Sequence, residues 1–270
     1  MSDTAWIETT AARAAEFRRM HQGPGMLVMP NAWDAASART FEAAGFPAIA
    51  TTSGGVAVSL GYQDHEGAPV EEMLAAAGRI TRAVAVPVTL DLEAGYGLPP
   101  AELIQRTVAL GAVGCNLEDS DHHGEAVLVG ADAHAERIAA ARAAARALGV
   151  DLVLNSRIDV FIHRMGTPEE QLAEGVRRGQ LYRDAGADCL YPIGLRDEAI
   201  LAAFVKAVGV PVNINTRRNG GIPLTRLAAI GVRRVTFATS LFRDLQDVLG
   251  GFATEIRDAL PLDAVRKSSA

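Results

Sequence analysis

Three carboxylates follow two predicted strands that are neighbours along the chain. Asp91 and Glu93 lie two residues apart in "LDLEAGYG", so in an extended strand their side chains share one face. Glu118 ends the next apolar segment, "GCNLED". Ionised carboxylates without a nearby lysine would repel one another, and a divalent cation would relieve that repulsion. Oxygen ligands favour Mg²⁺, with Mn²⁺ as an alternative, whereas the competing interpretation is that these acids cap helices or line surface loops.

Two further segments carry groups that can bind an anion. "TTSGG" ends another apolar segment, and the consecutive backbone N–H groups of Ser53, Gly54 and Gly55 can hold a carboxylate or enolate oxygen, unless the stretch is a plain turn. Arg157 closes the segment "DLVLNSRID", where a charged side chain needs a partner. That partner is either a substrate carboxylate or a local acid such as Asp159.

The composition excludes several classes of protein. The 270 residues carry a formal net charge of −6, which argues against nucleic-acid binding. No apolar run approaches the roughly 18 residues of a membrane span, and the N-terminus lacks a secretory signal pattern. Cys115 and Cys189 lie in apolar segments, which predicts buried, reduced thiols without a disulfide. We therefore expect a cytoplasmic protein that binds neither nucleic acid nor membrane.

A repeated arrangement predicts how these residues are positioned. Alanine-rich helical segments end in a glycine that a short β-branched run follows, and the glycines are Gly45, Gly111, Gly149, Gly186, Gly209 and Gly231. Two more apolar runs, "GMLVMPN" and "VPVTLDLE", complete eight predicted strands. Alternating strands and helices imply a parallel α/β sheet, and eight units favour a (β/α)₈ TIM barrel over an open doubly wound sheet. In a barrel the carboxyl ends of the strands form the active site, and the polar residues gather at these ends.

Helical segments at both ends complete a single predicted domain over residues 1–270. The segment from Thr4 to His21 precedes the first strand and is expected to cover the bottom of the barrel. The segment from about 241 to 262 is helical material that Gly250 and Gly251 interrupt. That break would let the last helix swing away from its own barrel.

Taken together, the predicted strand ends resemble the isocitrate lyase/phosphoenolpyruvate mutase superfamily, in its methylisocitrate lyase-like form. The resemblance runs from about Gly25 to about Leu245 and rests on the order and spacing of "TTSGGVAVSLGYQD", "DLEAGYG", "GCNLEDS", "NSRID" and "VNINTRRNG". It implies a (β/α)₈ barrel whose C-terminal helix is exchanged between the subunits of a homodimer or homotetramer. It also implies Mg²⁺ and a small 2-oxo or 2-hydroxy carboxylate in the site.

The resemblance also assigns roles to individual residues. The metal-site acids look like Asp91, Glu93 and Glu118, some acting through water, with Asp64 in the outer shell, and the family usually has aspartate where Glu93 stands. The resemblance implies that Arg157 holds substrate oxygens and takes part in catalysis. The expected substrate-binding residues are Thr51, Ser53, Gly54, Gly55, Asp91, Arg157 and Asn215.

The loop after Glu118 departs from the family pattern. It reads "SDHHGEAVLVGADAHAER" and has neither the cysteine that transfers a proton in the lyases nor a lysine, and Ile193 replaces a glutamate of the lyases. His122 and His123 are either solvated loop residues or supply a general acid or base. Tyr96 and Tyr62 are further candidates for proton transfer.

These features favour a Mg²⁺-dependent carbon–carbon lyase that acts on a 2-alkylmalate, methylisocitrate or isocitrate-like acid through an enolate of a 2-oxo acid. Decarboxylation of an oxaloacetate-like acid is an alternative, because it needs no base at the departing carbon. Hydrolysis of a P–C bond is a third chemistry that the resemblance allows. A non-catalytic protein that binds 2-oxo acids is the fourth alternative, which the missing cysteine favours and the acids oppose.

Overall fold

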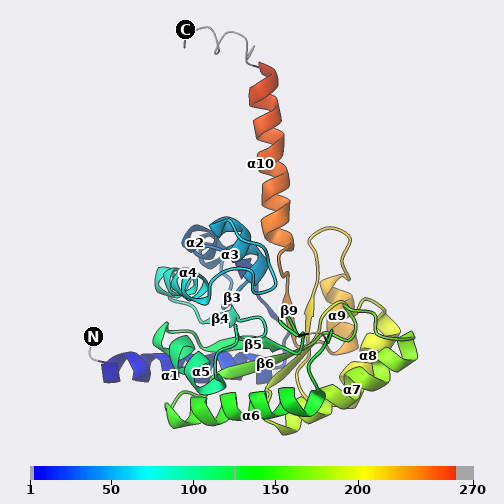
Figure 1. Cartoon of the computed structure of the whole chain (residues 1–270). Helices are drawn as coiled ribbons and strands as arrows, with labels where there is room; N and C mark the ends of the chain where they lie inside the picture. The colour runs from blue at the N-terminus through cyan, green and yellow to red at the C-terminus, as the bar shows by residue number, and fades with distance from the viewer. Residues whose placement is uncertain (1–2, 125, 260–270) are drawn as a thin grey trace.

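The computed structural model describes residues 3–124 and 126–259, with side chains from residue 6 onward. Strands and helices alternate along the chain, and all strand pairs in sheet ladders are parallel (Figure 1). The strands are β1 (Leu27–Val28), β2 (Asn31–Ala32), β3 (Ile49–Thr51), β4 (Val88–Asp91), β5 (Gly114–Glu118), β6 (Val153–Ile158), β7 (Cys189–Pro192), β8 (Asn213–Asn215) and β9 (Arg234–Thr236).

The strands close into a barrel of eight positions, because β1 and β2 are two parts of one interrupted first strand. β1 pairs with β9, and β2 pairs with β3, so this strand joins the sheet on both sides. The ladder runs β2-β3-β4-β5-β6-β7 and β1-β9-β8, and a bridge between Leu190 and Val212 links β7 to β8. Pro30 lies at the interruption and has no N–H to donate to a ladder. The predicted (β/α)₈ fold is therefore confirmed.

Helices alternate with the strands, and the sequence predicts the glycines that follow six of them. The helices are α1 (Asp3–Gln22), α2 (Ala35–Ala43), α3 (Ser53–Leu60), α4 (Val70–Ala83), α5 (Pro100–Ala109), α6 (Ala131–Ala147), α7 (Pro168–Asp184), α8 (Glu198–Val208), α9 (Leu224–Ile230) and α10 (Ser240–Ala259). Capping boxes start α2 and α7. The six glycines expected after helices all have positive φ, from 71° at Gly149 and Gly209 to 109° at Gly186.

Helix α1 covers the N-terminal end of the barrel, as expected. Its Phe17 is fully buried and fills the space beside Gly114, where an added Cβ would lie 2.9 Å from the ring. Arg18 bridges to Asp188 and Asp151 on the loops that enter β7 and β6. These contacts fix the bottom of the barrel, so that variable chemistry is confined to the opposite end.

The barrel interior is unusually polar. (β/α)₈ barrels are usually filled by bulky branched apolar residues. Here several buried polar side chains come from the inward faces of β4, β5, β6, β8 and β9: Thr89, Asn116, Asn155, Asn213, Arg234 and Thr236. Hydrogen bonds link pairs of them, such as Asn155 to Asn116 at 2.7 Å. The polar interior leads directly to the C-terminal end of the barrel, where the sequence predicts the active site.

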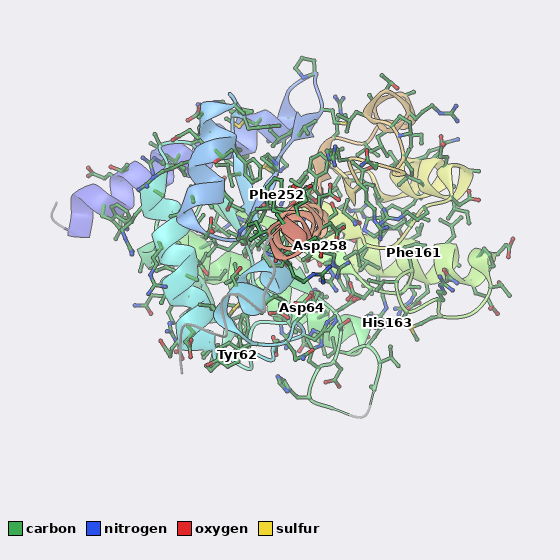
Figure 2. All side chains as sticks on the ribbon, turned by 90° about the horizontal axis from the view of Figure 1, so that it is seen from above. Tyr62, Asp64, Phe161, His163, Phe252 and Asp258 are labelled. Carbon is green, nitrogen blue, oxygen red and sulfur yellow. The ribbon has the colours of Figure 1, made fainter. Side chains whose placement is uncertain are left out.

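The C-terminal helix differs from the prediction. Gly250 and Gly251 do not break it, since α10 is one continuous helix from Ser240 to Ala259, and residues 260–262 of the predicted segment lie outside the described residues. Figure 1 shows α10 standing away from the barrel, and Figure 2 looks down its axis, with Phe252 and Asp258 on it. Its exposed apolar side chains are Leu245, Val248, Leu249, Phe252 and Ile256.

Neither cysteine forms a disulfide, and both thiols are buried as predicted, which raises the pKa of Cys115 and of Cys189 to about 12. Within the part of the chain that the structure describes, no helix combines the length and apolar character needed to cross a membrane.

Candidate active site

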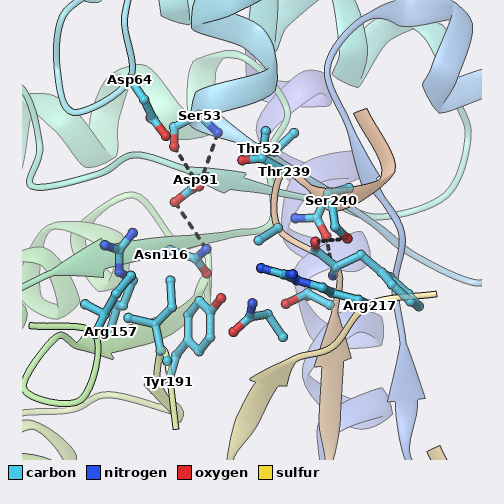
Figure 3. A pocket seen from close by; sticks show the side chains of 18 of the residues that line it. Thr52, Ser53, Asp64, Asp91, Asn116, Arg157, Tyr191, Arg217, Thr239 and Ser240 are labelled. Carbon is cyan, nitrogen blue, oxygen red and sulfur yellow. Dashed lines mark hydrogen bonds between the residues drawn. The ribbon is translucent and has the colours of Figure 1, made fainter. Parts of the chain in front are cut away.

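A cavity of about 350 Å³ opens at the C-terminal ends of the strands (Figure 3). This volume lies in the range of small-ligand sites. Side chains from most strand ends line it, and those that matter below are Asp64, Asp91, Asn116, Arg157, Tyr191 and Asn215, with Arg196, Arg217 and Arg243 from the loops and from α10. The polar strand ends therefore meet in one place, as the barrel predicts.

Asp91 lies at the centre of the hydrogen bonds around this cavity. One carboxylate oxygen accepts the Ser53 backbone N–H at 3.2 Å and the Ser53 hydroxyl at 3.0 Å. The other accepts the amide Nδ2 of Asn116 at 3.3 Å. The backbone N–H of Asp91 donates to the Thr51 hydroxyl at 2.8 Å. Asp91 is thus held from the rim and from the floor of the cavity while its carboxylate remains at the cavity surface.

The predicted anion-binding turn is the first turn of α3. Thr52 caps the helix by accepting the Gly55 N–H, and the Ser53 N–H already binds Asp91. An added Cβ on Gly54 would lie 2.5 Å from a carboxylate oxygen of Asp64, so a larger residue would force the Asp64 side chain to move. The turn therefore binds a carboxylate of the protein itself. Its contact with a substrate carboxylate stays a prediction.

Glu93 does not line the cavity, and its predicted contact with a metal bound at Asp91 stays a prediction. Its carboxylate accepts the Tyr96 hydroxyl at 2.8 Å and the Glu66 backbone N–H at 2.7 Å. Glu93 and Tyr96 both have positive φ, 50° and 55°, so the chain turns sharply after Asp91 and the same-face rule for extended strands no longer applies. Burial raises the pKa of Glu93 to about 7.

Glu118 is also occupied by partners within the protein. It is buried at the end of β5, where it accepts a hydrogen bond from His122 at 2.5 Å and forms an ion pair with Arg157. Burial raises the pKa of Glu118, and the Arg157 charge opposes that rise. Arg157 therefore offsets part of the expected repulsion, although the charges of Asp159 and Asp91 still contribute to the raised pKa of Glu118.

The predicted metal-site acids do not form one bare cluster in the structure. Among the described residues, no group of three or more histidine, cysteine, aspartate or glutamate side chains is placed to hold a metal ion. Protein partners hold Glu93 and Glu118, so the direct or water-mediated contact of Asp91, Glu93 and Glu118 with a metal ion stays a prediction. Asp91 and Asp64 are the carboxylates that line the cavity. Mg²⁺ is commonly bound through one or two carboxylates with water and substrate oxygens in the remaining positions, so these two residues fit such an ion.

Arg157 pairs with local acids of the protein, which was the alternative to binding a substrate carboxylate. Its Nε and Nη2 each donate to one oxygen of Asp159 at 2.7 Å, and its Nη1 pairs with Glu118. The guanidinium is thus held by two buried acids, which raise the pKa of Arg157 despite its burial. It lines the cavity, but its nitrogens are committed, so a substrate clamp at Arg157 stays a prediction.

The histidines and the tyrosine predicted to transfer protons do not line this cavity. His122 contacts Glu118 and lines a neighbouring hollow that also contains His65 and Arg157. His123 is largely exposed and bonds Glu66. The Tyr96 hydroxyl donates a hydrogen bond to Glu93, and burial raises the pKa of Tyr96. This position argues against the expected catalytic role. Tyr62 donates to Glu72, also outside the cavity.

Three arginines that the sequence reasoning missed line the same cavity as Asp91. Arg196 follows β7, Arg217 follows β8, and Arg243 lies in the first turns of α10. Arg196 donates to the backbone oxygen of Asn215, whereas the side chains of Arg217 and Arg243 have no partner among the described residues. The motif "NTRRNG" ends a predicted strand and could have identified Arg217. Arg243 lies in a helix distant in sequence and carried no signal.

Tyr191 is a further residue that the sequence reasoning missed. It ends β7 and is almost fully buried, and Figure 3 shows its hydroxyl directed into the cavity. The hydroxyl has no hydrogen-bond partner among the described residues. Burial raises the pKa of Tyr191, and the nearby Arg157 opposes that rise. The phenol is therefore neutral near pH 7 and can donate a hydrogen bond or a proton to a ligand.

Comparison with known proteins identifies relatives of this site and fold. Residues 17–257 match the family model described as phosphoenolpyruvate phosphomutase. A solved structure from Burkholderia cenocepacia J2315, described as a lyase/mutase, is 39% identical, has a TM-score of 0.86, and aligns over 94% of this chain and 91% of its own. The solved structure of 2,3-dimethylmalate lyase in its triclinic crystal form is 27% identical, has a TM-score of 0.80, and aligns over 92% of this chain and 88% of its own. Its trigonal crystal form has a TM-score of 0.79 and aligns over 86% of its own chain. The 2-methylisocitrate lyase of Escherichia coli K12 is 29% identical over 74% of this chain and 69% of its own length.

Proposed function

The chain belongs to the phosphoenolpyruvate phosphomutase family of lyases and mutases, and from that premise we propose that it cleaves a carbon–carbon bond in a small 2-hydroxy dicarboxylate with the help of a divalent cation. Its named relatives include lyases, and the chain is an enzyme of that class. The observation that carries the proposal is the charge content of the cavity, which Asp64 and Asp91 line together with Arg196, Arg217 and Arg243. A cation at the aspartates and an anionic substrate group at the arginines would complement both.

Asp91 would hold the cation, with Asp64 in support, as the fit of these two carboxylates suggests. Mg²⁺ or Mn²⁺, when bound, would stabilise negative charge on the oxygens of the 2-oxo acid half of the substrate. The N-terminal turn of α3 would orient the same half through the Gly54 N–H, since the Ser53 and Gly55 N–H groups are already used. Asp64 would accept the proton of the C2 hydroxyl as that carbon becomes a carbonyl.

The arginines would act on the other half of the substrate. When the bond between C2 and C3 breaks, its electron pair stays on C3 and delocalises into the carboxylate attached there. Arg196, Arg217 and Arg243 are placed to stabilise that growing charge, because an exposed guanidinium binds a carboxylate through charge-assisted hydrogen bonds. A substrate with one carboxylate would leave these arginines unpaired, so the site favours dicarboxylates.

A proton must then reach C3, and Tyr191 is the best-placed donor. The family cysteine is absent from the loop after Glu118, and His122 and His123 lie outside the cavity. Tyr191 presents a neutral phenol inside it, and the phenolate left behind would be stabilised by Arg157 until solvent restores the proton. This assignment replaces the proton-transfer role expected of Tyr96.

The test is a substrate panel followed by pyruvate release. We expect Mg²⁺-dependent cleavage of 2,3-dimethylmalate or of a 2-methylisocitrate-type acid, abolished by EDTA and restored by Mn²⁺. Turnover of oxaloacetate alone, with release of carbon dioxide, would favour the decarboxylase alternative, and release of phosphate from phosphonopyruvate would favour P–C hydrolysis. Tight binding of 2-oxo acids without any turnover would overturn the proposal.

We also propose a homo-oligomer, a dimer or tetramer, in which α10 packs on a neighbouring subunit. The helix exposes a row of apolar side chains, among them Phe252 at 55% and Ile256 at 61%, while it stands apart from its own barrel. Apolar surface of this kind is typical of an interface. Sedimentation of Phe252→Asp/Ile256→Asp should show a smaller species than the wild type, and an unchanged mass would contradict the exchange of α10.

A further inference from the structure

Arg234 is an uncompensated charge in the interior of the barrel. It points inward from β9, and its side chain is fully buried. Among the described residues no carboxylate pairs with it, and its Nε and Nη1 atoms have no hydrogen-bond partner there. The remaining nitrogen, Nη2, donates to Oδ1 of Asn116 at 3.3 Å. The barrel thus encloses a guanidinium whose single protein hydrogen bond leads toward the cavity floor.

Burying an unpaired charge of this kind destabilises the folded protein. Burial lowers the pKa of Arg234, which means that the protein interior disfavours its charge. The ring of Phe17 lies 6.0 Å from the guanidinium carbon and offsets part of this through a cation–π contact. Replacing a buried charge by an apolar side chain of similar volume is often neutral or stabilising. Packing alone therefore gives no reason for arginine at this position.

The hydrogen bonds above Arg234 give a reason. Arg234 Nη2 and Asn155 Nδ2 both donate to Oδ1 of Asn116, at 3.3 and 2.7 Å. Because two donors converge on the amide oxygen, the amide nitrogen of Asn116 must point the other way, and it donates to Asp91 at 3.3 Å. The orientation of Asn116 is thus set from below, and Asn116 in turn holds one oxygen of Asp91.

We propose that Arg234 is a positioning residue that locks the amide of Asn116 and thereby holds the Asp91 carboxylate in its binding orientation. Ser53 holds the other Asp91 oxygen from the rim, so Arg234 supplies the support from the floor. Partners behind a ligand side chain commonly change metal affinity when they are removed. The inference rests on the proposed function only in that Asp91 binds a divalent cation.

The test is Mn²⁺ binding, followed by electron paramagnetic resonance of the free ion, in a double-mutant cycle. Arg234→Lys keeps the charge and loses the reach to Asn116, so it isolates orientation from the electrostatic field. We expect it to weaken Mn²⁺ binding about tenfold in the wild-type background and less than about twofold in an Asn116→Leu background. Equal weakening in both backgrounds, or wild-type affinity in Arg234→Lys, would overturn the proposal.

A stability measurement separates this role from a structural one. Arg234→Met removes the buried charge, and its melting temperature should equal or exceed that of the wild type. A large fall in melting temperature with unchanged Mn²⁺ affinity would show that Arg234 serves the fold alone.

If the wild type binds no Mn²⁺, the metal assignment fails, and the orientation is read instead from a crystal structure of Arg234→Met. An Asn116 amide turned away from Asp91 would support the positioning role, and an unchanged amide would refute it.

Discussion

The charged side chains on the two sides of the cavity differ in their burial and in their hydrogen-bond partners. On the acid side, Asp91 lines the cavity, while Glu93 and Glu118 lie outside its lining. Each of these carboxylates has protein partners, and Glu93 and Glu118 are buried. On the arginine side, defined by Arg196, Arg217 and Arg243, the side chains are exposed and two of the three have no partner among the described residues. Buried charges must be paired, whereas exposed charges are hydrated and can wait for a ligand.

This difference separates fixed machinery from a surface that selects substrates. The acid side is pre-set by hydrogen bonds from three other elements, so its geometry does not depend on the substrate. The arginine side has side chains that can rearrange around an anion of varied size. We therefore expect substitutions on the acid side to affect all substrates, and substitutions on the arginine side to affect them unequally.

The sharpest challenge to the comparison is Asp91→Ala. We expect kcat/KM to fall by about 10³-fold or more for every substrate, because charge stabilisation by the cation is worth several kcal/mol. Mn²⁺ binding should be lost in parallel. The surface variant Glu102→Ala should behave like the wild type, and unchanged Mn²⁺ affinity in Asp91→Ala would remove Asp91 from the metal site.

The next largest effect is expected at Tyr191, which lies between the two sides. Tyr191→Phe should lower kcat about 10²-fold with little change in KM, since it removes a proton donor and keeps the ring. The measurement is steady-state pyruvate release together with deuterium incorporation at the protonated carbon in D₂O. Tyr62→Phe, outside the cavity, is the matched control, and equal rates in both variants would exclude Tyr191 as the donor.

On the arginine side, two adjacent arginines provide a matched pair. Arg217 lines the cavity, whereas Arg218 pairs with Asp244 outside it. Arg217→Met should raise KM for a dicarboxylate about tenfold to a hundredfold, the loss of one or two charge-assisted hydrogen bonds, and leave the Kd of pyruvate unchanged. Arg218→Met should change neither constant. An equal loss of pyruvate and dicarboxylate binding in Arg217→Met would mean that the arginines do not select the second carboxylate.

The smallest effect is expected at His123. Its side chain is 67% exposed and contacts Glu66, so His123→Ala should lower the unfolding free energy by less than about 1 kcal/mol and leave turnover unchanged. Urea unfolding and the pyruvate assay check both values. A marked loss of activity would return His123 to the list of catalytic groups and place the loop after Glu118 within the site.

Much of the fold could be predicted because its signals are local. The glycines after α2, α5, α6, α7, α8 and α9 mark helix ends through their positive φ, and the apolar runs after them became the barrel strands. The prediction for α10 was wrong because glycine inside a helix costs only about 1 kcal/mol, which a helix of this length tolerates. A pair of glycines within a helical segment looks the same in the sequence whether it only weakens the helix or breaks it.

In the candidate site, too, the local features could be predicted from the sequence and the long-range contacts could not. The sequence by itself determined that Asp91 ends a barrel strand, that Arg157 needs an acid, and that polar residues gather at one end of the barrel. Only the tertiary structure decided that Glu93 bonds Tyr96 and Glu66, and that His122 and Arg157 contact Glu118. It also decided that Arg196, Arg217 and Arg243, from two loops and α10, line the same cavity as Asp91. Strand ends follow from local periodicity, but the partner of a buried charge is whichever group the folded chain brings beside it.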